Sequence, residues 1–320
     1  MQALFIMAKS DPLNGKLVVI AGGSGFLGNY VAQALLERGA RLRIASRHPE
    51  EAFSLKPLAN LGQIQFARCD IKNERSAEAV VHGADAVVNM VGSFDGDLIE
   101  LMGRSAGQLA AAAKQAGVTS FVQVSAIGAD AESAAEYAQA KAIGEQLVLE
   151  AFPSATILRP SIIFGKDDNF LNMFAGLIQF MPVLPVFAPE AKLQLVYVDD
   201  VAEAVAETLA HPGKHGGKTY ELGGPEQLTM MEINRRISAA QGRERTFIPM
   251  PDMVSGIFAA LPLTPMGTDQ WRLLKQGNVV GEKALGFKQL GIEPKPLSLF
   301  LDRWMVQYRK HGRFAMASKN

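Results

Sequence analysis

Cysteine is almost absent from this sequence, with one residue, Cys69, in 320. A single cysteine excludes an internal disulfide framework and a cysteine-rich zinc site, and it is typical of a protein kept in a reducing compartment. Cys69 ends an apolar stretch, which favours a buried structural thiol over a reactive one. No metal site is predicted.

An excess of charge of either sign is also missing. Lysine and arginine total 32, as do aspartate and glutamate. Proteins that bind nucleic acid usually carry a clear basic excess, so no nucleic-acid partner is expected. The tail at residues 304–320 is the exception, because it holds basic residues and no acidic ones. We interpret it as a solvated end, or as a contact to an anionic lipid surface through Arg309, Lys310 and Arg313.

Long apolar runs are missing as well, since no uninterrupted stretch reaches 18 residues. A transmembrane helix is therefore not expected. The apolar stretch 3–8 is too short for a signal peptide and no basic residue precedes it, so residues 1–15 are predicted to be a leader arm. The most apolar segment, 170–189, contains Asn172, Gln179 and three prolines, which favour a helix followed by a loop.

Apolar strand patterns alternate with helical periodicity in the first half of the chain. This alternation predicts an α/β fold with a Rossmann-like doubly wound parallel sheet over residues 16–165. Residues 166–303 are predicted to form a smaller α+β lobe packed on the carboxyl edge of the sheet, with a return segment at 193–223. Strands are expected at 17–20, 41–45, 63–70, 85–92, 120–126 and 155–161, with short ones near 193–198, 218–222 and 245–249, and helices at 26–38, 73–82, 97–116 and 134–151.

The segment "GGSGFLG" contains Gly22, Gly25 and Gly28 in the spacing G-x-x-G-x-x-G. The segment follows the first predicted strand, and its residues Phe26 and Leu27 open the first predicted helix. Glycine lets the backbone approach a pyrophosphate, and the helix N-terminus offers free N–H groups to it. The segment therefore predicts a dinucleotide site, with a glycine turn that binds no ligand as the alternative.

The end of the second strand indicates which dinucleotide is bound. An acid there would bind the ribose 2′-hydroxyl of NAD, but the sequence has Ser46, Arg47 and His48, and no acid before Glu50. A guanidinium suits a 2′-phosphate because it is always charged and offers a fork of donors. NADPH or NADP is therefore favoured over NAD. A solvated loop charge is the alternative for Arg47, and His48 is expected to support the loop.

Residues after the third and fourth strands are expected to complete the site. Asp70 and Ile71 follow the third strand, where a carboxylate can accept a hydrogen bond from the adenine amino group. Capping of the next helix is the alternative for Asp70. Met90, Val91 and Gly92 end the fourth strand, and Gly92 allows the backbone to approach the cofactor closely.

In "EYAQAK", Tyr137 lies four residues before Lys141, so a helix would place the phenol and the ammonium on one face. Three roles are open for such a pair. It can transfer a proton, hold the hydroxyl groups of a sugar, or form an ordinary surface contact.

These segments, with "VSAIGAD" and "LRPSIIFG", resemble the extended and atypical branches of the short-chain dehydrogenase/reductase superfamily over roughly residues 16–225. The resemblance implies that Ser125, Tyr137 and Lys141 act together, with the ammonium lowering the pKa of the tyrosine and the serine orienting a carbonyl or alcohol. It also implies that Lys141 holds the nicotinamide ribose, and that Pro160 and Ile162 contact the cofactor.

A closer similarity runs from "VSAIGAD" through "LQLVYVDDVAEAV" to the segment at 246–280. It is to the family of nucleotide-binding accessory subunits of respiratory complex I, the NADH:ubiquinone oxidoreductase, in a bacterial form. This resemblance implies a mainly structural or regulatory NADPH and partners among the core subunits of the peripheral arm. It also implies a peripheral position on the cytoplasmic face of the bacterial inner membrane, near the quinone site.

The alternative is an NADP-dependent reductase, dehydrogenase or epimerase acting on an apolar substrate. Ser125 and Tyr137 are only 12 positions apart, a shorter separation than extended-branch enzymes usually have, which favours the accessory subunit. The apolar segments 170–189 and 257–266 are open to three interpretations: a substrate pocket, a contact to a partner or membrane, or plain core. The sequence leaves open whether the chain turns over any substrate by itself.

Overall fold

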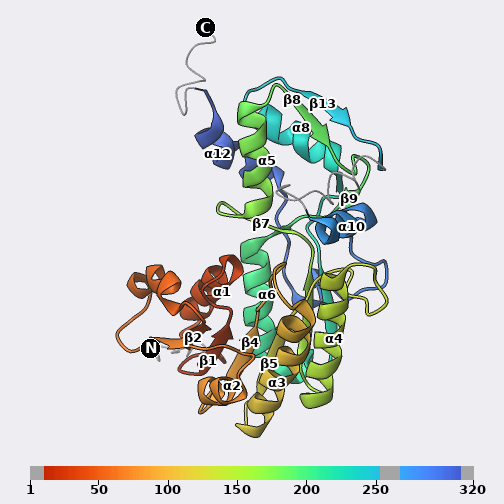
Figure 1. Cartoon of the computed structure of the whole chain (residues 1–320). Helices are drawn as coiled ribbons and strands as arrows, with labels where there is room; N and C mark the ends of the chain where they lie inside the picture. Colours follow the sequence, from red (N-terminus) through yellow and green to blue (C-terminus); the bar gives the residue numbers. More distant parts are fainter. Residues whose placement is uncertain (1–10, 253–266, 311–320) are drawn as a thin grey trace, which may run out of the picture.

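The computed structural model of the protein describes residues 11–252 and 267–310 (Figure 1). Its centre is a seven-stranded sheet in the order β11-β6-β5-β4-β1-β2-β3, and every neighbouring pair runs parallel. The predicted doubly wound, Rossmann-like sheet is therefore confirmed. Its strands are β1 (Leu17–Ala21), β2 (Arg41–Ser46), β3 (Ile64–Arg68), β4 (Ala86–Asn89), β5 (Ser120–Val124), β6 (Thr156–Pro160) and β11 (Thr219–Leu222).

Both faces of the sheet are buried because alternate strand residues point to opposite sides. Val18 and Ile20 of β1 belong to the core on the side of α1 and α6, whereas Val19 and Ala21 belong to the core on the side of α2, α3 and α4. The unbroken apolar sequence of β1 follows from this double coverage. The covering helices are α1 (Phe26–Glu37), α2 (Glu74–Val81), α3 (Ser105–Gln115), α4 (Glu136–Ala151) and α6 (Val198–Ala210).

The helix predicted at 97–116 begins as a π-helix, η2 (Ile99–Arg104), and continues as α3. Glycines let this pair of segments lie directly against α4. A Cβ atom on Gly144 would overlap the carbonyl oxygen of Met102, and one on Gly107 would lie 2.7 Å from Cβ of Leu147. Wide π turns often occur beside functional sites, and this one borders the helix that carries Tyr137 and Lys141.

The second lobe lies beyond the carboxyl edge of the sheet, at the top of Figure 1. Its core joins α5, α8 and α12, with buried Trp271, Leu301 and Met305 among the members. The predicted strand near 218–222 is β11, which pairs with β6 in the main sheet. The other elements are η1 (Pro49–Leu58), β7 (Ile163–Phe164), α5 (Asn169–Phe180), β8 (Val183–Val186), β9 (Lys192–Leu193), β10 (Val196–Tyr197), α7 (Pro212–His215), β12 (Leu228–Thr229), α8 (Met230–Ala240), β13 (Thr246–Pro249), α10 (Thr268–Gln276), α11 (Phe287–Leu290), α12 (Ser298–Trp304) and η3 (Met305–Tyr308).

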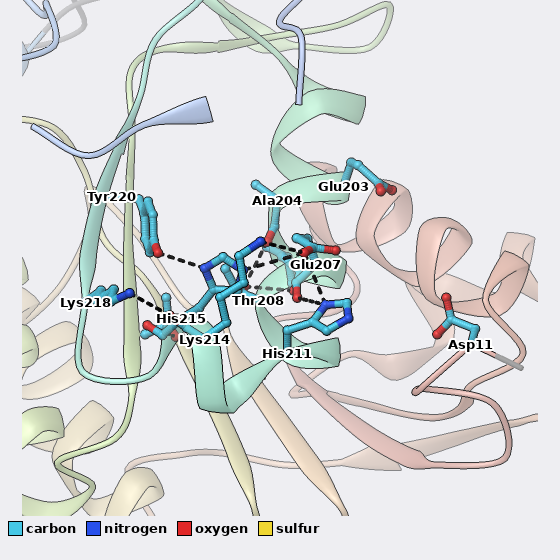
Figure 2. A network of polar contacts seen from close by, with 12 residues as sticks. Asp11, Glu203, Ala204, Glu207, Thr208, His211, Lys214, His215, Lys218 and Tyr220 are labelled. Carbon is cyan, nitrogen blue, oxygen red and sulfur yellow. Dashed lines mark hydrogen bonds and ion pairs between the residues drawn. The ribbon is translucent and has the colours of Figure 1, made fainter. Parts of the chain in front are cut away.

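A polar network lies where α6 and α7 lead into β11 (Figure 2). The buried His215 places Nδ1 2.7 Å from the Tyr220 hydroxyl and Nε2 3.6 Å from a carboxylate oxygen of Glu207. Glu207 also lies 3.1 Å from His211 Nδ1 and 3.8 Å from Arg38. The return of the chain to the sheet is therefore fixed by polar contacts as well as by the strand pairing.

Several predictions fall on residues that the structure does not describe. They concern the first ten residues of the leader arm at 1–15, the apolar segment 257–266, and the end of the basic tail, including Arg313. Within residues 11–252 and 267–310, no helix is long and apolar enough to cross a membrane.

Candidate nucleotide-binding site

The turn between β1 and α1 has the geometry for which glycine is required. Gly22 has φ +80°, and a Cβ atom there would lie 3.1 Å from the backbone of Met90. A Cβ atom on Gly28 would lie 2.7 Å from Cα of Gly23, so α1 contacts the turn without an intervening side chain. The backbone at the start of α1 is thus bare, and its N–H groups can face an anion.

A cavity of about 210 Å³ opens at this turn, between the carboxyl ends of β1, β2, β3 and β4. Most of the predicted cofactor-binding residues line it. Four others were missed, of which Ser24 and Cys69 neighbour predicted positions, whereas Leu101 arrives from η2 with no local sequence signal. The lining residues are Gly22, Ser24, Gly25, Ala45, Ser46, Arg47, Cys69, Asp70, Ile71, Met90, Val91, Gly92 and Leu101.

A second group of predicted cofactor residues lies outside this lining and serves packing. The carbonyl of Pro160 accepts a hydrogen bond from Ile127, and the amide of Ile162 donates to Asn278. The ring of Phe26 lies against Gly165, where a Cβ atom would be 2.9 Å away. Cofactor contact stays a prediction for this group, which comprises Phe26, Leu27, Gly28, Pro160 and Ile162.

The rim beside β2 combines one cation with hydroxyl groups. Arg47 is exposed and lines the cavity. The hydroxyl of Ser46 lies 2.7 Å from that of Ser24 and accepts a hydrogen bond from the backbone amide of His48. Glu51, which the sequence did not single out, accepts a hydrogen bond from Ser24 at 3.4 Å and adds a carboxylate to the rim.

Asp70 does not cap α2, which was the alternative to its predicted contact with the adenine. Asn73 caps α2 by accepting a hydrogen bond from the amide of Ser76, and the Asp70 carboxylate accepts a local one from the amide of Lys72. The neighbouring Cys69 is buried, as predicted, and burial raises the pKa of its thiol. A carboxylate and a neutral thiol therefore border the cavity here.

Lys141 lies beside Gly92 of the cavity lining, near the ring of Tyr137 and against the carbonyl of Val124, the residue before Ser125. Lys141 is 4% exposed, donates to the carbonyl of Val124 at 3.2 Å, and lies 3.6 Å from where a Cβ atom of Gly92 would sit. Ser125 is also 4% exposed, and its hydroxyl has no hydrogen-bond partner among the described residues. A buried hydroxyl without a partner is costly, and a bound ligand would satisfy it.

The pKa shifts of the pair differ from the expectation. Burial raises the pKa of Tyr137 to about 12. Burial also lowers the pKa of Lys141 to about 8, although the Glu145 carboxylate opposes that shift. The ammonium lies 5.7 Å from the centre of the tyrosine ring, and desolvation dominates at that distance. In this state the phenol is a proton donor and not a base.

Lys141 also begins a line of alternating charges. Glu145 lies one turn further along α4 and makes two hydrogen bonds to Arg159, at 2.8 and 2.6 Å. Arg159 lies 3.7 Å from Glu221 on β11. The sequence offers no local signal for this line, because its members come from α4, β6 and β11.

The N-terminus of α4 is held by the second lobe. Helix α4 has no side-chain cap of its own, and the carboxylate of Asp269 accepts a hydrogen bond from the amide of Tyr137 at 3.0 Å. Arg272, one turn later on α10, donates to the carbonyl of Ala134 at 2.8 Å. Two residues of α10 therefore fix the position of the tyrosine.

Comparison with known families gives a match along most of the chain. The profile of the NmrA-like family matches residues 14–270. A mitochondrial protein of Arabidopsis thaliana, NADH dehydrogenase (ubiquinone) 1 alpha subcomplex subunit 9, is 31% identical, covering 94% of this chain and 80% of its own length. A ceramide reductase of Caulobacter vibrioides is 28% identical, covering 81% of this chain and 79% of its own length.

Solved structures show the same fold. An NADPH-dependent quinone oxidoreductase from Escherichia coli, crystallised with NADPH, superposes with a TM-score of 0.73 at 22% identity. The match covers 89% of this chain and 99% of that protein. At this level of identity the likeness shows the fold alone.

Proposed function

Because the chain belongs to the NmrA-like family, within the extended short-chain dehydrogenase/reductase fold, we propose that it is an NADP(H)-binding accessory subunit of NADH:ubiquinone oxidoreductase. The cofactor in this proposal is mainly structural or regulatory. The observation that carries it is the 31% identity to the Arabidopsis complex I subunit, which extends over 94% of the chain. The relationship inferred from sequence motifs is confirmed by that match.

The geometry of the site supports NADP(H) as the cofactor. Glycine at positions 22 and 28 keeps the turn and the start of α1 close to the sheet, because a Cβ atom on Gly22 would lie 3.1 Å from the Met90 backbone and one on Gly28 2.7 Å from the Gly23 backbone. Arg47 supplies a cation for a 2′-phosphate, and Asp70 a carboxylate for the adenine amino group. The NADPH-bound fold relative supports the same choice. NAD is less favoured because Glu51, the nearest rim carboxylate, belongs to η1 and not to the end of β2.

Ser125, Tyr137 and Lys141 would hold the nicotinamide half. Lys141 would bind the ribose hydroxyl groups, and Ser125 would gain the hydrogen-bond partner that it lacks in the protein alone. When bound, the reduced nicotinamide supplies a hydride. Tyr137, neutral at pH 7, would hold the proton that a carbonyl oxygen needs.

A second candidate function is an NADP-dependent reductase, dehydrogenase or epimerase acting on an apolar substrate. It is favoured by the presence of Ser125, Tyr137 and Lys141, with Lys141 5.7 Å from the centre of the Tyr137 ring, and by the 28% identity to a ceramide reductase. Tyr137→Phe separates the two functions. In an enzyme it would abolish NADPH-dependent turnover while NADPH stays bound, whereas in an accessory subunit it would change only cofactor affinity.

The proposed function is tested by purification of the tagged protein from its own cells in mild detergent. Co-purification of core subunits of the peripheral arm, with NADP(H) released on denaturation of the eluted protein, is the expected result. A lone monomer or dimer without those subunits would refute the assignment to complex I.

The proposal extends to a peripheral position on the cytoplasmic face of the bacterial inner membrane, near the quinone site. The basic tail is its candidate lipid contact. Of the two cations in residues 304–310, Arg309 donates to the carbonyl of Ala240 and Lys310 is exposed. Salt-sensitive binding to anionic vesicles, weakened by Lys310→Glu, would support this position; equal binding to neutral vesicles would contradict it.

A further inference from the structure

Phe94 lies in the loop that leads from β4 to η2, two residues after Gly92 of the cavity lining. The loop is shaped by its own hydrogen bonds. The amide of Asp95 donates to the Ser93 hydroxyl at 2.9 Å, and that hydroxyl lies 3.1 Å from the Asp95 carbonyl oxygen. This small turn presents the phenyl ring toward α4.

The ring of Phe94 stacks on the ring of Tyr137. Their centroids are 4.5 Å apart and their planes differ by 15°. Phe94 is 49% exposed, so one side of its ring covers the phenol while the other remains open to solvent. Aromatic stacking of this kind stabilises the position of Phe94 on Tyr137 only modestly, so another aromatic ring can displace Phe94.

Ser125, Tyr137 and Lys141 offer hydrogen-bond donors of the kind that bind a carbonyl. The buried Ser125 hydroxyl has no partner among the described residues, Tyr137 carries a proton, and the Lys141 ammonium lies 5.7 Å from the centre of the tyrosine ring. The phenyl ring of Phe94 covers one face of the Tyr137 ring. A flat ligand that stacked on this face would have to displace Phe94.

We infer that Phe94 is a gate residue that keeps ligands from Tyr137, and that the site behind it takes a flat aromatic carbonyl compound. The inference rests on the proposed NADP(H) binding. It accounts for how an accessory subunit can retain these three side chains and still hold its cofactor without consuming it.

With the gate removed, the reaction is the reduction of an aldehyde to an alcohol by NADPH. A hydride passes from the nicotinamide to the carbonyl carbon, the π bond of the carbonyl breaks, and NADPH becomes NADP⁺. The Tyr137 hydroxyl gives its proton to the carbonyl oxygen and takes a new one from water, with Lys141 stabilising the transient phenolate. One proton from solvent is consumed for each NADPH oxidised.

The test compares wild type, Phe94→Ala and the control Phe180→Ala, which removes an exposed phenyl ring at the end of α5. NADPH binding is first measured for each by fluorescence. Benzaldehyde, whose ring matches the one removed, is then titrated into the NADP⁺-loaded proteins and followed by ligand-observed NMR. Phe94→Ala is expected to bind it roughly tenfold more tightly than wild type or the control.

The same proteins are then assayed with NADPH and benzaldehyde. The Phe94→Ala variant should form benzyl alcohol. The double variant, Phe94→Ala with Tyr137→Phe, should bind benzaldehyde but form no benzyl alcohol. Equal benzaldehyde binding by wild type and Phe94→Ala, an equal gain in the control, or loss of NADPH from Phe94→Ala alone would each overturn the gate. Failure of wild type to bind NADPH would instead refute the proposed function, and the gate with it.

Discussion

At the scale of single residues, glycine backbones decide how closely α1 approaches the sheet. Gly28 and Gly23 touch without side chains between them, and Gly22 reaches the backbone of β4. These contacts depend on the absence of one carbon atom at each position. A substitution here tests the packing and the cofactor site together.

Gly28→Ala should destabilise the protein by about 1–3 kcal/mol, because its Cβ would meet the Gly23 backbone at 2.7 Å. NADPH affinity should fall as α1 moves away from the turn. The matched control is Gly176→Ala in α5, where a Cβ atom meets nothing within 4 Å. That variant should gain roughly 0.5–1 kcal/mol from helix propensity. Urea unfolding of both variants measures the difference, and equal losses would contradict the packing argument.

Lys141 is a buried cation, and burial lowers its pKa to about 8 because the charged form is less stable inside the fold than in water. Between about pH 8 and its ordinary value near 10.5, the unfolded chain binds a proton here that the folded chain has released. The free energy of unfolding therefore rises with pH through this window. The buried ammonium therefore lowers the stability of the cofactor-free protein at neutral pH.

Lys141→Met should raise the free energy of unfolding at pH 7 by roughly 3 kcal/mol in the cofactor-free protein. The variant should also lose the contribution of Lys141 to the rise in the free energy of unfolding between about pH 8 and 10.5. In addition, it should bind NADPH more weakly. Denaturant unfolding at several pH values, compared with wild type, measures this. A variant that is less stable at pH 7 and unchanged in NADPH affinity would contradict both roles.

At the scale of elements, α10 supplies the cap that α4 lacks. The pairing was not predicted, because Asp269 and Tyr137 are far apart in sequence and an N-cap is recognised only from its immediate neighbours. The π-helix η2 was likewise not predicted, and its contact with α4 joins Met102 to Gly144, which are far apart in the sequence. Long-range packing overrode the local pattern in both cases.

Asp269→Ala should destabilise the protein by about 1 kcal/mol, the usual effect of a lost cap. Its specific effect should be faster hydrogen exchange at the amide of Tyr137 and in the first turn of α4. Asp302→Ala is the control, because Asp302 is exposed on α12 and its nearest ion-pair contact, with Arg309, is 4.0 Å. Unchanged exchange in the first turn of α4 would show that the Asp269 contact does not hold it.

At the scale of the whole molecule, the network around His215 joins α6, α7 and β11 at the end of the sheet away from the cofactor (Figure 2). Burial lowers the pKa of His215, and the positive charge of Lys214 adds to this while Glu207 opposes it. The folded protein therefore prefers the neutral imidazole. Stability from this group is present above its ordinary pKa of about 6.5 and is lost as the pH falls below it.

His215→Gln should reduce the loss of thermal stability between pH 7 and pH 5, even if it lowers stability overall. The control is His211→Gln, because His211 is partly exposed and contacts the same Glu207. Melting temperatures across this range give the slopes. If wild type and His215→Gln lose stability in parallel, His215 does not contribute to the pH dependence.

Most of the sheet, and much of the cavity lining at the ends of β1, β2 and β3, could be predicted from sequence. Their residues lie next to one another in the chain, as Gly22 to Gly28 and Ser46 to Arg47 do, and strand periodicity is a local signal. The gate at Phe94, the charge line from Lys141 to Glu221 and the place of β11 depend on contacts between distant segments. Such contacts leave no pattern in a single sequence.

The place of β11 has a consequence for how the chain is made. Strand β6 forms its outer hydrogen bonds with residues 219–222, which leave the ribosome about 60 residues after it. Until then, the nascent sheet ends in an open edge whose backbone groups can pair with other chains. A fragment ending at residue 165 would keep that edge permanently, so we expect it to aggregate although it contains the whole glycine turn. The second half of the chain thus protects the first during synthesis.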